Sequence, residues 1–440
     1  MSDNQLPRVT PTPPGDGAAH GPEATAPTAA EVAPEQRAPS GDDGDRWSRA
    51  LREIASGNVL MSILSIILAL VVGAVLIAST NDEVQEAAGY FFSRPSDMLR
   101  AIGEAVGGAY SALFQGSVYN FRREGFAAGI RPLTDTLTYA TPLIAGGLGV
   151  ALAFRVGLFN IGGRGQMLVA AGAGGWVAFS WELPAGIHLV VALVFGIAAG
   201  AAWGGIVGVL KARTGAHEVI VTIMLNYVAF YLISYLLRTP VLGTPGSNNP
   251  QSPASLPTAV FPDLLGPGYN LHFGFLIVIA ATVFAWWLID RSSLGFRFRA
   301  VGENPAAARV AGIDVKRVYI VAMLISGGLL GLAGVNQVLG TTTSGFGAGI
   351  DAGIGFDAIT VALLGRSRPF GVFLAGVLFG AFKAGGFSMQ AAEGVPIDIV
   401  VVVQSLIVLF IAAPPLVRAI FRLPAPGARP ARSRKEGVTS

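Results

Sequence analysis

The sequence predicts an all-α membrane protein with about ten transmembrane helices, and three observations carry this prediction. Of the 440 residues, 52% are hydrophobic and only 13% are charged, against roughly 25% charged in a soluble domain. The apolar residues gather in runs of about 20, the length that crosses a hydrocarbon core of roughly 30 Å. Lys and Arg gather in the gaps between these runs. A soluble globular fold is therefore disfavoured.

The apolar runs are bounded by charge, proline or glycine, and they place one transmembrane domain over 46–425. Residues 1–45 are rich in Pro, Ala, Gly and acidic residues and have almost no large apolar side chain, so we expect a disordered cytoplasmic tail. Residues 426–440 are expected to form a basic cytoplasmic tail. The expected spans are 58–79, 132–154, 161–181, 185–210, 217–238, 271–290, 317–339, 352–365, 369–387 and 395–420.

The distribution of cations sets the expected orientation. Short loops on the cytoplasmic side of a membrane carry an excess of Lys and Arg. The short loops at about 182–184, 240–270, 340–351 and 388–394 hold neither residue and are therefore expected outside. Both termini are therefore expected inside. The long 80–131 segment holds arginines but lies outside in this scheme; its apolar residues recur at helical spacing, which predicts an interfacial helix, with a plain extracellular loop as the alternative.

Two glycine-rich helix starts indicate an internal repeat. Residues 159–170 open the third span, and 353–362 open the eighth. Because these spans run in opposite directions in the expected topology, the two halves would form an inverted repeat with a solute path near the midplane. Chance similarity of two such starts is the alternative.

Several kinds of site are absent from the sequence. There is no cysteine and there are four histidines, which excludes disulfides and leaves little material for a metal centre. No phosphate-binding loop G-x-x-x-x-G-K-[ST], G-x-S-x-G elbow or H-E-x-x-H motif occurs, so neither an enzyme nor a bound cofactor is expected. The cations flank spans rather than a soluble face, which argues against a nucleic acid polymer as partner. Transport or scaffolding remains.

Polar residues within the spans are the candidates for a solute path, because such groups are costly in lipid. Arg164 and Asp357 hold matching places in the expected repeat and could pair or face a wet cavity. Glu218 lies near a helix start, where capping is the alternative role. For each uncharged residue, hydrogen bonding between helices is the alternative. The candidates are Asn160, Gln166, Glu218, Thr222, Asn226, Asp357 and Gln404.

The cytoplasmic segment 291–317 is the most specific feature. Asn304 before Pro305 can cap a short helix, and Gly312 can end it. That helix would carry a small apolar knob, formed by Ala307, Ala308, Val310 and Ala311, that suits a groove on another protein. A basic helix resting on anionic lipid is the alternative.

This segment resembles the coupling loop of ATP-binding-cassette importer permeases of the branched-chain amino acid, ribose and nucleoside group. Three further stretches are similar to the nucleoside or simple-sugar branch: GLFNIGGRGQ at 157–166, HEVIVTIMLNY at 217–227 and GFDAITVALLGR at 355–366, together with 394–396 and Gln404. The resemblance covers about 58–420. The sequence departs from the family pattern at Arg164, where an acidic residue is expected, and at Ala306, where a glutamate is expected.

The resemblance implies a multi-pass protein of the bacterial plasma membrane that forms the path for a small-molecule solute, a nucleoside or simple sugar. Its implied partners, besides the lipid bilayer, are a cytosolic ATP-binding subunit, a second and non-identical permease subunit, and an extracellular substrate-binding lipoprotein. The implied ATPase-coupling residues are Gly302, Asn304, Pro305, Ala307, Ala308, Ala311 and Gly312. A proton-coupled secondary transporter that uses Asp357 or Glu218 is the alternative function, and a membrane scaffold is a third.

Overall fold

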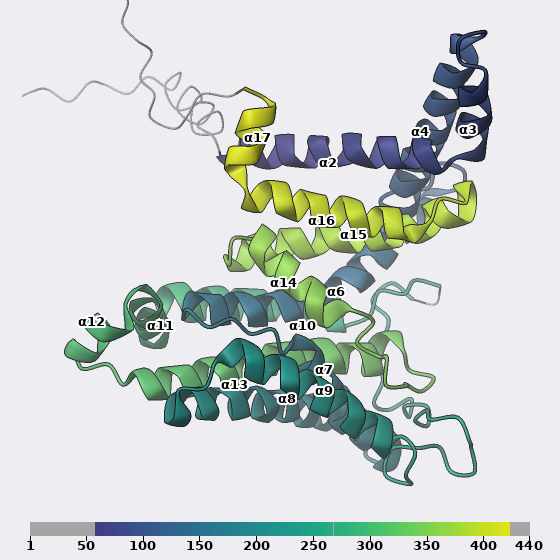
Figure 1. Cartoon of the computed structure of the whole chain (residues 1–440). Coiled ribbons are helices and arrows are strands. Elements are labelled where there is room, and N and C mark those ends of the chain that lie inside the picture. The colour runs from purple at the N-terminus through teal and green to yellow at the C-terminus, as the bar shows by residue number, and fades with distance from the viewer. Residues whose placement is uncertain (1–57, 267, 423–440) are drawn as a thin grey trace, which may run out of the picture. The chain divides into compact units, whose positions relative to one another are not determined.

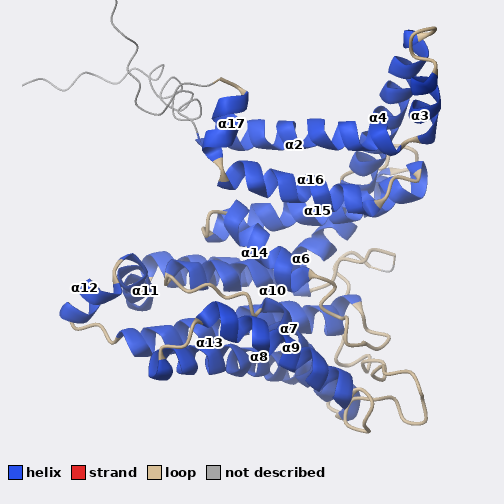
Figure 2. Ribbon diagram, in the orientation of Figure 1, coloured by secondary structure: helices blue, strands red, loops and turns tan. Residues whose placement is uncertain are grey.

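The computed structural model describes residues 58–266 and 268–422, and this part of the chain is all-helical (Figures 1 and 2). The only β-pairing in these residues is an isolated bridge between Asp263 and His272. The expected tails at 1–45 and 426–440 lie outside the described residues. The predicted all-α class is therefore confirmed for the described chain.

The helices follow the apolar runs of the sequence closely. In chain order they are α2 (Asn58–Thr80), α3 (Asp82–Gly89), α4 (Pro95–Ser117), α5 (Phe126–Gly129), α6 (Arg131–Arg155), α7 (Gly163–Ser180), α8 (Ile187–Thr214), α9 (Glu218–Leu236), α10 (Gly274–Trp286) with the π-turn η1 (Trp287–Arg291), α11 (Ser293–Glu303), α12 (Pro305–Val310), α13 (Val315–Asn336) with the π-turn η2 (Gln337–Thr341), α14 (Ile354–Leu364), α15 (Pro369–Glu393), α16 (Ile397–Ala412) and α17 (Pro414–Ile420).

Of the ten expected spans, seven are helices long and apolar enough to cross a membrane. The run at 395–420 breaks at Pro414 into α16 and α17, which meet at 96°. The run at 352–365 yields only the 11-residue α14, because Gly353 and Gly365 flank it. The run at 161–181 forms the glycine-rich α7 of 18 residues. The described residues therefore contain seven such spans, or eight if the bent pair is one span, and the expected ten are not confirmed.

The helices α8 and α13 pack against each other at backbone distance. A Cβ atom on Gly200 would lie 2.7 Å from the carbonyl oxygen of Gly327, and one on Gly204 would lie 2.6 Å from that of Met323. Small residues at such crossings allow main chains to approach without an intervening layer of side chains. This contact joins the two halves of the chain.

The 80–131 segment is helical rather than a plain loop. Its main helix, α4, packs on α15: a Cβ on Gly385 would lie 2.4 Å from the carbonyl oxygen of Leu113. Ala101, Ala109 and Ala112 are buried. The segment therefore contains a helix, as predicted, and the place of that helix at the outer membrane interface stays a prediction.

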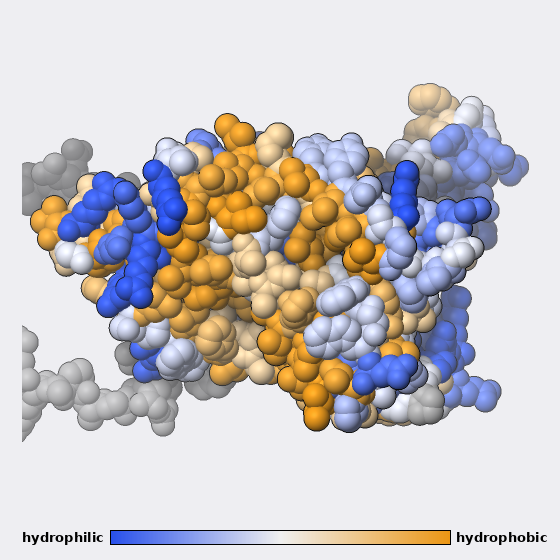
Figure 3. Space-filling model, turned by 90° about the horizontal axis from the view of Figure 1, so that it is seen from below, coloured by the Kyte–Doolittle hydropathy of each residue, from blue (hydrophilic) through white to orange (hydrophobic). Residues whose placement is uncertain are grey.

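The face seen in Figure 3 carries a broad apolar area, with hydrophilic residues gathered toward its two ends. Helices α8 and α9 supply many exposed large apolar side chains, among them Val190, Val194, Ile220, Met224 and Leu232. A soluble protein rarely exposes this much contiguous apolar surface, whereas a lipid-facing surface requires it. The exposed faces of these helices suit a bilayer.

The 239–273 loop is irregular, as its prolines predict, but it is firmly bonded. Its backbone exchanges hydrogen bonds with the loop after α13: Ser252 N donates to Phe346 O at 2.9 Å, Ser255 N to Thr343 O at 2.9 Å. Phe346 N in turn donates to the hydroxyl of Ser252 at 2.9 Å. The two loops therefore form one layer over the same ends of the helices.

Candidate functional site

Three of the predicted path residues come together in a buried group that we call the amide cluster: Asn160, Gln166, Asn226 and Ser326. Asn160 Nδ2 donates to Gln166 Oε1 at 3.1 Å and to Ser326 Oγ at 2.8 Å. Gln166 Nε2 donates back to Asn160 Oδ1 at 3.1 Å. Ser326 Oγ donates to the carbonyl of Gly149 at 2.7 Å. Asn160, Gln166 and Ser326 are at most 1% exposed.

The amide cluster also binds backbone at the start of α7. Asn226 Oδ1 accepts from Gly165 N at 2.8 Å, and its Nδ2 donates to Ile161 O at 3.0 Å. Asn160 Oδ1 accepts from Gly162 N at 3.0 Å. A helix start leaves N–H groups without intrahelical acceptors, and these amide oxygens satisfy two of the N–H groups beside it. In this structure the amide groups hold helices together.

The loop between α6 and α7 turns back along α6. Asn160 reaches, through Ser326, the carbonyl of Gly149, which lies six residues before the end of α6, or about 9 Å at the helical rise. Helix α7 therefore begins well inside the helical layer rather than at its edge. Irregular backbone at such depth is tolerated only where protein groups or a wet cavity satisfy it.

The two glycine-led helix starts predicted as a repeat meet each other. A Cβ on Gly163 would lie 2.7 Å from Gly355 O, and one on Gly355 would lie 2.4 Å from Arg164 N. Arg164 Nε pairs with Asp351 Oδ1 at 3.3 Å rather than with Asp357, and its guanidinium lies 4.8 Å from the ring centre of Phe230. Of the two alternatives for Arg164 and Asp357, direct pairing is therefore not observed.

The remaining predicted path residues do not join the hydrogen bonds of the amide cluster, although Glu218 and Thr222 lie one turn apart on α9. Thr222 lies beside the cluster, because a Cβ on Gly162 would be 3.2 Å from Thr222 Cβ and 3.1 Å from Asn160 Oδ1. Thr222 is buried, and its hydroxyl donates to Val219 O of its own helix at 2.9 Å. Glu218 pairs with Lys211 at 2.7 Å and so closes the turn between α8 and α9. Asp357 is half-buried on α14, and Gln404 is half-buried on α16.

Two adjoining cavities lie at the ends of α6, α13 and α15 that the cation count assigns to the outside. The first, which we call the polar chamber, has a volume of about 640 Å³, and the second, the apolar chamber, about 450 Å³. Both are lined by Thr138, Tyr139, Thr341 and Phe387, so they share a wall. Their volumes fall in the range of roughly 300–1,000 Å³ typical of ligand sites.

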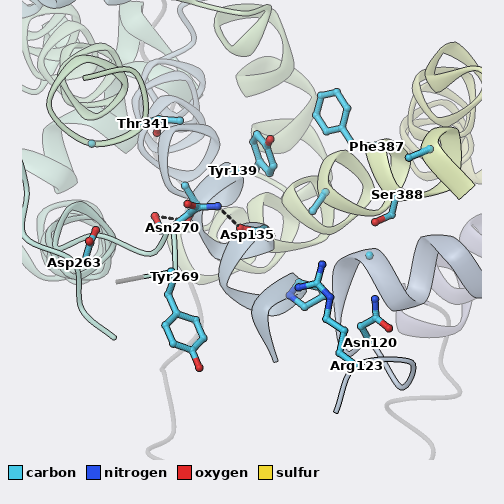
Figure 4. A pocket seen from close by; sticks show the side chains of 17 residues that line it. Asn120, Arg123, Asp135, Tyr139, Asp263, Tyr269, Asn270, Thr341, Phe387 and Ser388 are labelled. Carbon is cyan, nitrogen blue, oxygen red and sulfur yellow. Dashed lines mark hydrogen bonds between the residues drawn. The ribbon is translucent and has the colours of Figure 1, made fainter. Parts of the chain in front are cut away.

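The polar chamber carries hydrogen-bonding groups from distant parts of the chain (Figure 4). Asn270 Nδ2 donates to Asp135 Oδ1 at 2.7 Å, and Thr138 donates to the carbonyl of Asn270 at 3.0 Å. Figure 4 shows Tyr139 and Phe387 beyond this pair, with Arg123 on the opposite side. The chamber therefore combines a carboxylate, an amide and an aromatic wall.

The apolar chamber extends down to the start of α14. Pro142, Ile350 and Ile354 line it, together with the aromatic pair Tyr139 and Phe387, whose ring centres are 5.9 Å apart. Its polar side chains come from α6, from η2 and the residue after it, and from α15: Thr138, Gln337, Thr341, Thr342 and Lys383. Single π-turns within helices occur frequently at functional sites.

A second buried polar group, the His272–Asn336 pair, differs from the amide cluster. A Cβ on Gly274 would lie 2.6 Å from Asn336 Oδ1 and 2.7 Å from His272 Nδ1, so both side chains converge on this point. Among the described residues, His272 Nε2 and both polar atoms of the Asn336 amide have no hydrogen-bond partner. Burial lowers the pKa of His272 to about 4, and the charge of Asp263 opposes that shift.

The cytoplasmic segment forms the capped helix that the sequence predicts. Asn304 Oδ1 accepts from Ala306 N at 2.9 Å and from Ala307 N at 3.0 Å, and α12 starts at Pro305. Gly312 follows in the left-handed region, with φ of 81°.

One member of the predicted knob faces the other way. Ala308 is only 4% exposed and packs into the core, whereas Val310 is 92% exposed. Of the predicted knob, Ala307, Val310 and Ala311 are exposed, together with Pro305 and Ala306 at the start of α12, whereas the inclusion of Ala308 was wrong.

Sequence reasoning missed both chambers. Their aromatic wall joins a tyrosine of α6 to a phenylalanine of α15, nearly 250 residues later. Pro142 inside α6 was the one available signal, because a proline there removes a helical hydrogen bond and leaves the Thr138 carbonyl without its usual donor. Among the described residues, no group of three or more His, Asp or Glu side chains could hold a metal ion.

A family model described as "Branched-chain amino acid transport system / permease component" matches residues 133–412, well over half of the chain. The chain belongs to this permease family. It is an integral membrane protein of ATP-binding-cassette transport, as the sequence resemblance indicated, and the family is one of transport permeases rather than enzymes.

Three curated relatives match the permease over most of their length. A guanosine ABC transporter permease of Bacillus subtilis is 39% identical over 72% of this chain and 89% of its own. A glucose ABC transporter permease of Haloferax volcanii is 40% identical over 63% and 75%, and a nucleoside ABC transporter permease of Lactococcus lactis is 34% identical over 64% and 79%. Each organism also holds a second relative, 27% or 28% identical. No solved structure matches the permease.

Proposed function

We propose that the permease is one of two non-identical membrane subunits of an ATP-driven importer of a nucleoside or simple sugar. The observation that carries this proposal is its 39% identity, over 72% of the chain, to a permease named for guanosine transport. The presence of a second, more distant relative in each of the three organisms supports a paired partner. An ATP-binding subunit and an extracellular binding lipoprotein complete the proposed assembly.

The two chambers and the amide cluster suggest the route. The chambers open toward the proposed outer side, and the apolar chamber ends at the start of α14, where Gly355 packs on Gly163. The amide cluster lies directly beside that contact. We propose that a solute enters the chambers and passes the helix starts when α7 and α14 separate, with Asn160, Gln166 and Asn226 then bordering its path. The inverted relation of the two halves is part of this proposal.

The exposed face of α12 suits the docking of the ATP-binding subunit. Val310 is almost fully exposed on a helix capped at both ends, so an apolar side chain is presented on a preformed support. Val310→Asp should therefore uncouple ATP hydrolysis from uptake without affecting membrane insertion. Val241→Asp, at an exposed valine of the opposite end, is the matched control. Normal coupling in the first variant would count against docking at α12.

Reconstituted vesicles test the function as a whole. Vesicles that contain the permease with its partner subunits should take up solute only with ATP, and uptake should persist after the proton gradient is collapsed. Flux that follows the gradient without ATP would instead establish the secondary transporter. A scaffold would show no flux under either condition.

The proposed orientation has a direct test because the chain lacks cysteine. Asn248→Cys, in the loop after α9, should react with an impermeant maleimide added to intact cells. Asn304→Cys, at the start of α12, should react only after the membrane is opened. The reverse pattern would overturn the assignment of sides.

A further inference from the structure

The wall between the two chambers separates surfaces of different chemistry. On one side, Pro142, Ile350 and Ile354 present hydrocarbon next to the faces of Tyr139 and Phe387. The other side presents the hydrogen-bonded carboxylate and amide of the polar chamber. A ligand that fills both chambers must therefore have an apolar part and a part that carries hydrogen-bonding groups.

We propose that the chambers form a nucleoside site, with the base against Tyr139 and Phe387 and the sugar diol at Asp135. This inference rests on the proposed function and narrows its substrate class. Aromatic rings stack on nucleobases with a gain that does not depend on the base. A carboxylate offers about four lone-pair sites and accepts bonds only; Asn270 uses one, which leaves acceptors for two hydroxyl groups.

The spacing along α6 fits this division. Asp135 and Tyr139 are one helical turn apart, about 6 Å along the axis, and so lie on the same face of the helix. That separation suits the distance from the sugar hydroxyls to the base of one nucleoside. The amide of Gln337, carried on η2 and 7% exposed, lines the apolar chamber and can pair with the edge of a base.

A simple sugar fits the chambers less well. Its hydroxyl groups surround the ring, so each side of the ligand requires hydrogen-bonding partners. In the apolar chamber the side chains of Gln337, Thr341, Thr342 and Lys383 can bond some of these groups, but hydroxyl groups directed at Pro142, Ile350 and Ile354 would be buried without partners, which is costly. The aromatic pair alone does not discriminate between the two ligands, because an aromatic ring can also cover the face of a sugar. The hydrocarbon of Pro142, Ile350 and Ile354 in the same chamber does discriminate.

Photolabelling of the full chain in nanodiscs tests the proposal, because cross-linking captures a weakly bound ligand. We expect 8-azidoguanosine to label peptides that contain Tyr139 or Phe387, with protection by guanosine and not by glucose. Phe387→Leu should raise the concentration for half-maximal labelling about ten-fold, from the loss of stacking. Phe370→Leu, a change of a similarly exposed phenylalanine on the same helix, should leave it unchanged.

The role of Asp135 has its own matched ligand. Asp135→Asn should weaken protection by guanosine several-fold while leaving protection by 2′,3′-dideoxyguanosine unchanged, since that ligand lacks the diol. Equal effects on both ligands would overturn the placement of the sugar.

The outcomes separate this proposal from the function on which it rests. Labelling outside the chambers, no guanosine-protected labelling, equal labelling of Phe387→Leu, or equal protection by glucose would overturn the nucleoside site. ATP-dependent uptake of glucose alone would do the same and leave the importer intact. Uptake without any ATP dependence would overturn the proposed function itself, whatever the labelling shows.

Discussion

Helix α13 carries two buried polar groups with opposite character. Ser326 belongs to the amide cluster, in which Asn160 uses both its oxygen and its nitrogen. Asn336 lies ten residues later, about 15 Å along the helix, and its amide has no partner among the described residues. Both asparagines are 0% exposed, so burial alone does not distinguish them. The amide cluster therefore holds the helices together, whereas the unbonded amide of Asn336, beside η2, keeps its hydrogen-bonding groups unused.

The largest difference between the two polar groups is expected when each asparagine is replaced by leucine. Asn160→Leu should lower the free energy of unfolding by about 3 kcal/mol, because it leaves the Gln166 amide and the Gly162 N–H buried without partners. Asn336→Leu should change it by less than about 1 kcal/mol, because no protein hydrogen bond is lost. Unfolding of the purified chain in detergent gives both values.

The same pair of variants decides the role of the amide cluster. If Asn160→Leu folds normally and loses only uptake, the cluster borders the solute path and contributes little to stability. A similar loss of stability in both variants would remove the distinction between the two polar groups.

Two glycines, Gly355 beside the amide cluster and Gly349 at the apolar chamber, allow the same comparison for the backbone. Gly355→Ala should lower the free energy of unfolding by about 1–3 kcal/mol, because its Cβ would lie 2.4 Å from Arg164 N beside the amide cluster. Gly349→Ala, which lines the apolar chamber with open space around it, should be neutral within about 0.5 kcal/mol. Equal melting temperatures would mean that α7 and α14 separate easily.

Acid should weaken the permease through His272. Its pKa of about 4 in the folded chain lies below the ordinary value of 6.5, so the unfolded chain binds more protons between these limits. The stability contributed by neutral His272 is complete above about pH 6.5 and is lost as the pH falls toward 4. Between pH 7 and pH 5.5 the loss should be about 1 kcal/mol. His272→Gln should remove this part of the pH profile, and an unaltered profile would contradict the assignment.

The smallest effect is expected at the rim of the apolar chamber. Lys383 Nζ donates to Ala352 O at 3.4 Å, a long and exposed contact. Lys383→Met should therefore change the free energy of unfolding by less than about 0.5 kcal/mol. A large loss would show that the chamber wall is as tightly fixed as the amide cluster. The same melting measurement serves as the check.

Local features of the fold were predictable, because apolar run length and capping chemistry act over a few residues. Asn304, Pro305 and Gly312 specified α12 in this way. The break at Pro414 was missed, because 395–420 was expected as one span, although a proline cannot continue a helix without loss of a hydrogen bond. Residue runs also counted α14 as a full span, because apolar composition does not reveal how deep a helix begins.

The site was only partly predictable, because partners far apart in the chain decide it. The polar types at Asn160, Gln166 and Asn226 marked them as important, but their mutual bonding through Ser326 joins residues 166 positions apart. Arg164 forms an ion pair with Asp351 rather than with Asp357, because the loop before α14 brings Asp351 next to it. No periodicity in the sequence encodes such contacts.

The glycine contact between α8 and α13 has a mechanical consequence. The main chains of the two helices touch at Gly200 and Gly327, so no layer of flexible side chains lies between them. We therefore expect α8 and α13 to move as one rigid unit. Helix α13 begins five residues after α12 ends. A displacement of α12 is therefore expected to move α8 and α13 together and to reach η2 and the wall of the chambers at the other end of α13.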